Sequence, residues 1–482
     1  MTDAITDVKL SRRQFVGTAA AGAAALGAVA GATTLIPKVG AVPTNEGGPG
    51  RGKAATAVRG GPIPVPQNWS QTADVVVVGY GGAGAISAIS AYDAGANVLI
   101  LEKVPSFATL GFTGATYAGG GGNTSMDAGN AIYACDPIAA ATYYYQVCGG
   151  NTPMALCEAL AWMETDNPAW CTKMGVKYSG GLGKPGAGTQ LPEFTNLPGA
   201  SGFGAMTMTG GGNSFFATLA GQVQSRNIPV LFNTPATDLI QDPNTKEILG
   251  VQALANSSEV LNIRANRGVI LTTGSIEFNE ELKSDNFRPY PAHYYGWPYC
   301  TGDSVKMASK VGAAMWHMGV RDDHIIAWFP DYPNAYSVSV GTKIYVDKLG
   351  NRFTNESLTS TVNFHMHLMD YDINVPWYTR VPAFIISDAT GFATNFASGG
   401  GSTTLPTYYD PRAKFSNTMA LANGWIQQGA DIPSLVKAMN AKTYIGIDPK
   451  INSTSPFATA NVNIDPNVLT ATINAWNAMV AA

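Results

Sequence analysis

The chain has 482 residues, of which 45% are hydrophobic and only 13% are charged, and this composition excludes a chain that is disordered throughout. The formal net charge is −4 and no run of basic residues occurs, so nucleic acid is excluded as an expected partner. The 54 glycines form clusters without a three-residue period, which excludes collagen.

The first 36 residues have the pattern of an export signal. Arg12 and Arg13 precede an apolar stretch, rich in Ala and Gly, from about residue 16 to 32. A twin arginine before a weakly hydrophobic stretch is typical of a Tat signal, and the Ala and Gly content makes a membrane anchor the weaker alternative. We therefore predict a Tat signal over 1–36, with export to the periplasm or the outer face of the cell membrane. Residues 37–72 are rich in Pro and Gly and are predicted to be a linker.

Residues 73–102 have the pattern of a dinucleotide-binding βαβ unit. Continuous apolar residues over 73–78 and 97–101 predict buried parallel strands, and residues 85–95 predict the helix between them. A full Gly-x-Gly-x-x-Gly motif precedes the helix, and an acid follows the second strand. The helix N-terminus binds pyrophosphate, and the acid accepts hydrogen bonds from ribose hydroxyls, which leaves NAD and FAD open but disfavours NADP. The predicted nucleotide ligands are Gly79, Gly81, Gly82, Ala83, Gly84 and Glu102.

The segment after this acid resembles the flavoprotein family of fumarate reductase, urocanate reductase and 3-ketosteroid dehydrogenase. In that family the acid is followed by Lys and by a loop rich in Gly, Ser and Thr that wraps the flavin. The Tyr-Ala-Gly-Gly-Gly stretch at 117–121 is most similar to the ketosteroid dehydrogenase branch, whereas Ser106 and Phe107 replace two family glycines. The resemblance implies that FAD is the cofactor and that it contacts Lys103, Thr109, Gly114, Gly119 and Gly120.

The middle of the chain keeps the order of elements found in that family. Thr273-Gly274 at a strand end resembles the family's second FAD segment, and Thr301-Gly302-Asp303 resembles its Gly-Asp-Gly helix start. The resemblance implies further FAD contacts from Ala236, Thr273, Gly274 and Asp303. Helices are predicted over 153–174, 214–226 and 305–312, and strands over 229–233, 236–240, 248–254, 259–264 and 268–272.

The resemblance implies an α/β fold, in which a Rossmann-like FAD-binding domain over 73–322 is followed by an inserted α+β capping domain over 323–482. It covers about residues 73–480, and the family's last FAD segment has no counterpart among the residues of this sequence. From the resemblance we therefore expect either a truncated copy or one half of a split enzyme, with weak binding of FAD by this chain alone.

The capping region differs from the fumarate-reducing members of the family at three positions. Phe329, Ser339 and Ser360 stand where the resemblance places a His, an Arg and the proton-donating Arg. Because a dicarboxylate needs Arg side chains for its two carboxylates, fumarate and succinate are the less favoured substrates. Arg352 and Glu356 are retained, and we interpret them as an ion pair that fixes the cap.

Aromatic residues are abundant where those charged residues are missing. The segment 290–299 is rich in Tyr and Trp, and such residues can line a pocket for a neutral, flat, unsaturated substrate. A tyrosine can also supply the proton that such a reaction needs. Ordinary core packing is the alternative for each single tyrosine. The candidate proton donors are Tyr294, Tyr295 and Tyr345.

The sequence therefore predicts FAD-dependent redox chemistry at a C=C or CH–CH bond next to a carbonyl, similar to ketosteroid dehydrogenases or enone reductases. The alternatives are a fumarate reductase-type dicarboxylate reductase and a non-catalytic flavin-binding paralogue. The expected partners are a small unsaturated substrate and a separate electron donor or acceptor, such as a cytochrome or a membrane quinone system. The five cysteines form no Cys-x-x-Cys pair and the five histidines have no ligand-like spacing, so no metal site is expected.

Overall fold

The structure is a computed structural model, and residues 58–482 belong to one compact unit. The predicted export signal lies outside the described residues, and the predicted division at residue 322 stays a prediction. Among the described residues, no helix combines the length and the apolar character needed to cross a membrane. The structure describes residues 61–106, 120–122, 124, 130–179, 194–290, 292–294, 296–321, 326–328, 335–337, 342–356, 364–373, 377–393, 417–442, 444–445, 459–460 and 462–481.

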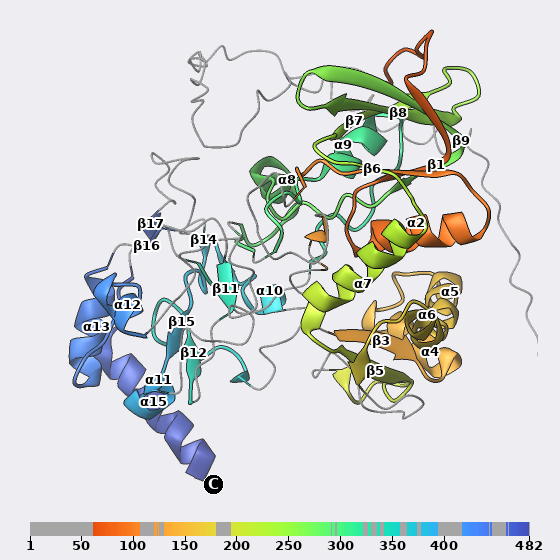
Figure 1. Cartoon of the computed structure of the whole chain (residues 1–482). Coiled ribbons are helices and arrows are strands. Elements are labelled where there is room, and N and C mark those ends of the chain that lie inside the picture. The colour runs from red at the N-terminus through yellow and green to blue at the C-terminus, as the bar shows by residue number, and fades with distance from the viewer. Residues whose placement is uncertain are drawn as a thin grey trace, which may run out of the picture. The chain divides into compact units, whose positions relative to one another are not determined.

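A six-stranded sheet organises the first part of this unit, in the order β6-β2-β1-β9-β8-β7 (Figure 1). Strands β6, β2, β1 and β9 pair in parallel, whereas β8 is antiparallel to both of its neighbours. Strand β2 and the residues Val75–Val78 of β1 are continuously apolar, because both faces of that part of the sheet are covered. The strands are β1 (Gln71–Val78), β2 (Val98–Leu101), β6 (Val230–Leu231), β7 (Ala236–Gln241), β8 (Ile248–Ala255) and β9 (Glu259–Leu271).

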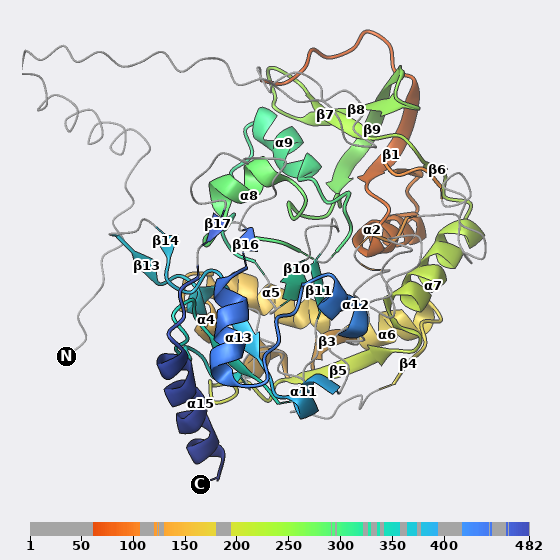
Figure 2. The same ribbon diagram turned by 90° about the vertical axis from the view of Figure 1, so that its left-hand side faces the viewer.

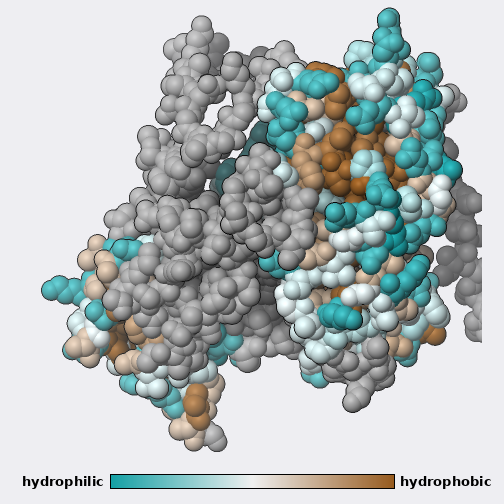
Figure 3. Space-filling view, viewed as in Figure 1, coloured by the Kyte–Doolittle hydropathy of each residue, from teal (hydrophilic) through white to brown (hydrophobic). Residues whose placement is uncertain are grey.

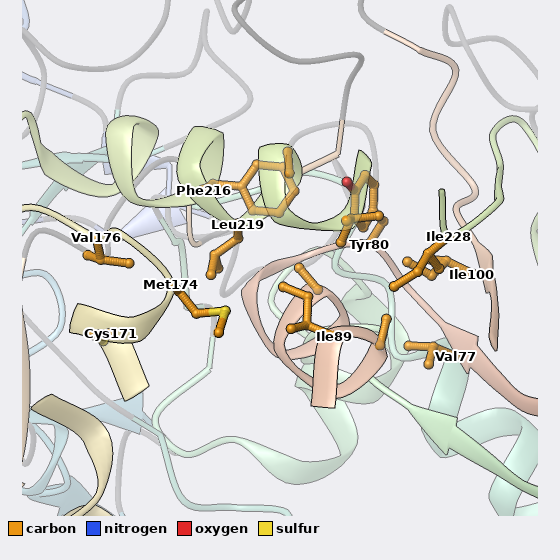
Figure 4. Packing of buried hydrophobic residues seen from close by; sticks show 14 of the residues in the cluster. Val77, Tyr80, Ile89, Ile100, Cys171, Met174, Val176, Phe216, Leu219 and Ile228 are labelled. Carbon is orange, nitrogen blue, oxygen red and sulfur yellow. The ribbon is translucent and has the colours of Figure 1, made fainter. Parts of the chain in front are cut away.

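Successive residues of β1 point to opposite faces of this sheet and enter two separate cores. Val77 packs with α2 (Gly82–Asp93) and α7 (Gly211–Ser225) in the core shown in Figure 4. Val76 and Val78 pack on the other face, with Met307 of α9 (Asp303–Lys310). Figure 3 shows hydrophobic side chains gathered over this sheet. The βαβ unit is thus fixed from both sides, and the ends of β1, β2 and β9 are held in register.

Several sequence predictions differ from the observed elements. Helix α2 begins at Gly82, three residues before the predicted start, because the glycines there already have helical geometry. The predicted strands 259–264 and 268–272 are one strand, β9, which changes partner from β8 to β1 near Arg264. The predicted linker also ends early, since Ile63 bridges Ile240 and the ring of Trp69 lies 5.6 Å from the Arg264 guanidinium.

A small three-stranded sheet, in the order β3-β5-β4, is accompanied by three helices. The predicted helix over 153–174 is interrupted by a turn near Thr165 and forms two helices. Helix α4 begins at Asp136, whose carboxylate accepts the N–H groups of Ile138 and Ala139. The elements are β3 (Asn130–Ala134), β4 (Tyr178–Ser179), β5 (Phe203–Met208), α4 (Pro137–Val147), α5 (Met154–Glu164) and α6 (Asn167–Lys173).

Short strand pairs and helices make up the rest of the described chain, as expected for an α+β region. One core joins β12, β15, α13 and α15 through residues such as Val346, Val436 and Leu469. Helices α8 and α9 lie next to each other in both views (Figure 1, Figure 2). The elements are β10 (Ile326–Trp328), β11 (Ala335–Ser337), β12 (Ile344–Val346), β13 (Tyr371–Asp372), β14 (Trp377–Tyr378), β15 (Phe384–Ile386), β16 (Tyr444–Ile445), β17 (Thr459–Ala460), α8 (Glu280–Asn286), α10 (Phe364–His367), α11 (Ala389–Ala393), α12 (Asn417–Ala422), α13 (Ile432–Asn440) and α15 (Pro466–Ala481).

The expected ion pair between Arg352 and Glu356 is present in this region. The guanidinium Nε donates to both carboxylate oxygens at 2.9 and 3.0 Å, and Nη2 donates at 2.5 Å. The carboxylate also accepts the N–H of Tyr345 in β12, and the guanidinium lies 4.8 Å from the Trp476 ring of α15. Burial opposes ionisation, but these donors together lower the pKa of Glu356. The pair therefore ties a loop to β12 and α15, which is a structural role.

Candidate functional site

The Gly-x-Gly-x-x-Gly motif forms the turn between β1 and α2 and lines a cavity. The N-cap residue of α2 is Gly81, which has no side chain to bond the free amides of the helix. The N–H of Gly82 donates to the hydroxyl of Thr124 at 2.9 Å, and the N–H groups of Ala83 and Gly84 have no partner among the described residues. Unsatisfied amides and the helix dipole make this helix end suited to an anion such as a diphosphate.

The three motif glycines are needed for different reasons. Gly79 has a positive φ of 105°, and a Cβ there would lie 2.4 Å from the Thr272 carbonyl oxygen. A Cβ on Gly84 would lie 2.0 Å from the Gly79 carbonyl oxygen. At both positions, any side chain would thus clash with the backbone of the chain itself. Gly81 has a φ of −90°, and among the described residues its Cβ would meet only the Gly121 carbonyl oxygen at 3.7 Å, an ordinary contact.

The chain itself therefore tolerates a side chain at Gly81, yet this residue lines the cavity. A glycine in that position leaves room for a ligand to approach the backbone closely. The space that Gly81 leaves in the cavity is therefore the evidence that the residues of this site fit a bound diphosphate.

Glu102 follows β2 and is buried, with 8% of its surface exposed, in the wall of the same cavity. One carboxylate oxygen accepts the N–H of Tyr80 at 2.8 Å, and the other accepts the N–H of Val104 at 2.9 Å. Burial raises the pKa of Glu102, and these two amides oppose the rise. The carboxylate is thus held rigidly at the cavity, where its remaining lone pairs can accept hydroxyl groups of a ribose.

A second glycine segment closes the cavity beside the motif. Gly121 pairs with Gly81, and the N–H of Gly121 donates to the carbonyl of Tyr80 at 2.7 Å. Gly121, Gly122 and Thr124 line the cavity. The sequence predicted a glycine-rich loop at 119–122. It did not predict the role of Thr124, because Thr124 and Gly82, whose N–H it accepts, are 42 positions apart in the chain.

The end of β9 and the start of α9 form the opposite wall. Lys103 pairs with Asp303 at 2.7 Å and donates to the Thr301 hydroxyl at 2.9 Å. Gly274 has a positive φ of 76°, and a Cβ there would lie 2.6 Å from the Cys300 sulfur. Burial raises the pKa of the Cys300 thiol to about 12, so this thiol is protonated at neutral pH.

Two aromatic residues of the segment 290–299, Trp297 and Tyr299, also line this cavity. Their ring centroids are 5.4 Å apart. Trp297 is buried, whereas Tyr299 is 42% exposed. These two members of the aromatic segment that the sequence suggested as a pocket wall are therefore adjacent to the predicted cofactor residues.

The structure brings together most of the predicted cofactor residues. Gly84 and Gly120 lie behind the lining, where they pack against Gly79 and Tyr80. Thr109, Gly114 and Gly119 lie outside the described residues. Those that line the cavity are Gly79, Gly81, Gly82, Ala83, Glu102, Lys103, Ala236, Thr273, Gly274 and Asp303. Lining residues that the sequence did not single out are Val78, Tyr80, Leu101, Thr234, Thr272 and Cys300, besides Thr124.

Of the candidate proton donors, Tyr294 and Tyr345 are not among the described residues that line this cavity. Tyr294 is packed between the Phe287 ring, 5.8 Å away, and the Lys283 ammonium, 5.7 Å away. Tyr345 is buried in β12, and Tyr295, like Phe329, Ser339 and Ser360, lies outside the described residues. In the described part of the chain, no three His, Cys, Asp or Glu side chains are grouped as a metal site would need.

A family model for the FAD binding domain matches residues 74–482. The chain belongs to this family, and its cofactor is FAD.

Known proteins of two activities are similar to the chain. The fumarate reductase (cytochrome) of Shewanella frigidimarina is 27% identical over 300 residues, which cover 60% of this chain and 48% of that protein. The 3-oxosteroid 1-dehydrogenase of Mycobacterium tuberculosis is 25% identical over 398 residues, which cover 66% of this chain and 68% of that protein. The chain spans only 31% to 48% of the fumarate-reducing relatives that it matches.

Solved structures agree on the fold. The 3-ketosteroid Δ1-dehydrogenase of Sterolibacterium denitrificans, in complex with 1,4-androstadiene-3,17-dione, is similar with a TM-score of 0.60 and 18% identity, covering 84% of this chain and 79% of that one. The expected α/β fold of a flavoenzyme is thereby confirmed.

Proposed function

We propose that the chain is an FAD-dependent oxidoreductase that acts on a C=C or CH–CH bond next to a carbonyl. The observation that carries this proposal is the cavity at the end of β1. There, Gly81, whose Cβ would not clash with any described residue, lies beside a buried carboxylate and a helix N-terminus with two amides that have no partner among the described residues. When bound, FAD supplies hydride transfer to or from a carbon atom.

The chain's own residues bind and orient the cofactor. The amides at the start of α2 hold the diphosphate, and Glu102 holds the ribose. The ion pair of Lys103 and Asp303 fixes the end of β2 against α9, so these walls keep their spacing. Trp297 and Tyr299 provide an apolar surface beside them. An apolar wall also restricts the access of water to the reacting atoms.

A neutral, flat substrate is favoured over a dicarboxylate. A dicarboxylate requires free cations, most often Arg. The sequence supports this preference, because Phe329, Ser339 and Ser360 stand where the resemblance to fumarate-reducing members places a His and two Arg. The 3-oxosteroid 1-dehydrogenase among the relatives acts, by its name, on a molecule of the favoured class.

Substrate preference is tested with the full chain saturated with FAD. A reduced dye serves as the electron donor for fumarate, a cyclic enone and an aryl acrylate, and an oxidised dye serves as the acceptor for a 3-ketosteroid. We expect turnover of an enone or a ketosteroid and none of fumarate above background. The dicarboxylate alternative rests on the similarity to fumarate reductases. Fumarate turnover by the FAD-loaded chain would establish that alternative and reject the neutral substrate.

Electrons are exchanged with a separate partner, a cytochrome or a membrane quinone system. Support comes from the relative in Shewanella frigidimarina, which is a fumarate reductase (cytochrome).

We further propose that residues 1–36 direct Tat export. The support is the pair Arg12-Arg13 before an apolar stretch that is rich in Ala and Gly. Replacing both arginines by lysine is expected to abolish accumulation of the protein in the periplasm, measured by cell fractionation, because the pathway recognises the arginine pair. Arg51→Lys, outside the signal, is the matched control and should be exported normally. Unchanged export of the double-lysine variant would contradict the proposal.

A further inference from the structure

Tyr80, the second residue of the Gly-x-Gly-x-x-Gly motif, has a buried side chain with 4% of its surface exposed. Its ring contacts the ring of Phe216 in α7 edge to face, with centroids 5.3 Å apart, and that of Phe232 at 6.0 Å. Figure 4 shows the Tyr80 ring within the core that also contains Ile89 and Leu219. The motif turn is therefore anchored in the hydrophobic core by one aromatic side chain.

The backbone of Tyr80 connects two walls of the cavity. Its N–H donates to the Glu102 carboxylate at 2.8 Å, and its carbonyl accepts the N–H of Gly121 at 2.7 Å. A displacement of Tyr80 would thus move the carboxylate and the second glycine segment together.

The ring of Tyr80 also contacts the second glycine segment directly. Gly120 has a positive φ of 91°, and a Cβ on it would lie 2.6 Å from Cδ1 of the Tyr80 ring. From Gly120 the segment continues to Thr124, whose hydroxyl accepts the N–H of Gly82 at the start of α2. Consecutive glycines are costly to order because they lose the most conformational freedom. A fixed ring against them reduces that cost before a ligand binds.

We propose that Tyr80 is a positioning residue for the FAD site: its core-anchored ring holds Gly120, Gly121 and the Glu102 carboxylate in the geometry that binds the cofactor. The inference rests on the assignment of FAD to this cavity. Tyr80 acts through the residues it holds, and the phenol hydroxyl has no part in this role.

The inference is tested by the affinity of the full chain for FAD, measured by titration with flavin fluorescence. Tyr80→Ala is expected to weaken binding by about 10-fold or more, because the ordering cost then falls on the binding step. Tyr80→Phe keeps the ring and should bind FAD within about 3-fold of the wild type. Leu219→Ala is the matched control, since Leu219 is fully buried in the same core and does not line the cavity. It should lower the melting temperature while leaving the affinity unchanged.

A second measurement needs no cofactor. Hydrogen exchange of the Gly121 amide in the ligand-free chain should become faster in Tyr80→Ala and stay unchanged in Tyr80→Phe and Leu219→Ala. If Tyr80→Ala does not fold, Tyr80→Leu replaces it in both measurements. Wild-type affinity and exchange in Tyr80→Ala, or equal losses in Leu219→Ala, would overturn the inference. A wild-type chain that binds no FAD but shows the expected exchange pattern would instead reject the cofactor assignment alone.

Discussion

Gly81→Val is expected to remove FAD from the chain while leaving it folded. The φ of −90° at Gly81 is accessible to any residue, and in the described part of the chain its Cβ would meet only the Gly121 carbonyl oxygen at 3.7 Å. The added side chain would instead occupy the space in front of the α2 amides. We expect FAD affinity to fall by about 100-fold or more, which corresponds to about 2.7 kcal/mol. The measurement is the flavin content after gel filtration, with far-UV circular dichroism to confirm the fold.

Two other glycines are the controls for this variant. Gly268→Ala in β9 should change neither the fold nor the flavin content, because no atom lies within 4 Å of the added Cβ and φ is not positive. Gly84→Ala should prevent folding, because its Cβ would lie 2.0 Å from the Gly79 carbonyl oxygen. Full FAD occupancy in Gly81→Val would refute the place of the diphosphate.

Glu102→Gln is expected to weaken FAD binding nearly as much, with little change in stability. Hydrogen bonds from ribose hydroxyls to a charged acceptor contribute about 1.5–3 kcal/mol each, so a loss of about 100-fold in affinity is expected. Stability changes little because two effects oppose each other. The NH₂ group of Gln must face one of the two backbone donors, Tyr80 or Val104, and the lost hydrogen bond lowers the stability. The neutral side chain also removes the cost of burying a charge, which raises the stability.

Glu259→Gln is the matched control for this variant, since Glu259 is exposed at the start of β9. It should have the affinity and the melting temperature of the wild type. Calorimetric titration with FAD and thermal unfolding provide the two readouts. An unchanged affinity in Glu102→Gln would show that the buried carboxylate serves only the local backbone.

Local patterns in the sequence were sufficient to predict the βαβ unit. The apolar run of β1, the motif glycines and Glu102 lie within about 30 residues, so spacing along the chain reflects spacing in the fold. The start of α2 was misplaced because glycines have low helix propensity, although here they form the first turn. Two strands were predicted where β9 is one, because Arg264 and Arg267 interrupt the apolar pattern with exposed side chains. The pairing with β1 resumes at Gly268 after a shift in register.

The remaining walls of the site come from residues distant in sequence. Thr124 reaches the start of α2 across 42 positions, and Lys103 reaches Asp303 across 200 positions. A pattern within a short stretch of sequence cannot predict contacts between residues that are so far apart in the chain. Tyr294 was a reasonable candidate by residue type, but its position depends on the packing of Phe287 and Lys283 around it. Tyr80 was overlooked because the variable position of the motif carries no pattern of its own.

The central claim is that the ADP half of FAD binds at the turn between β1 and α2. The most direct test is a set of calorimetric titrations of the full chain with FAD, ADP and FMN. The claim predicts that ADP competes with FAD for one site and that FMN, which lacks the adenosine and one phosphate, binds far more weakly than FAD. Tight binding of FMN together with no competition by ADP would contradict it.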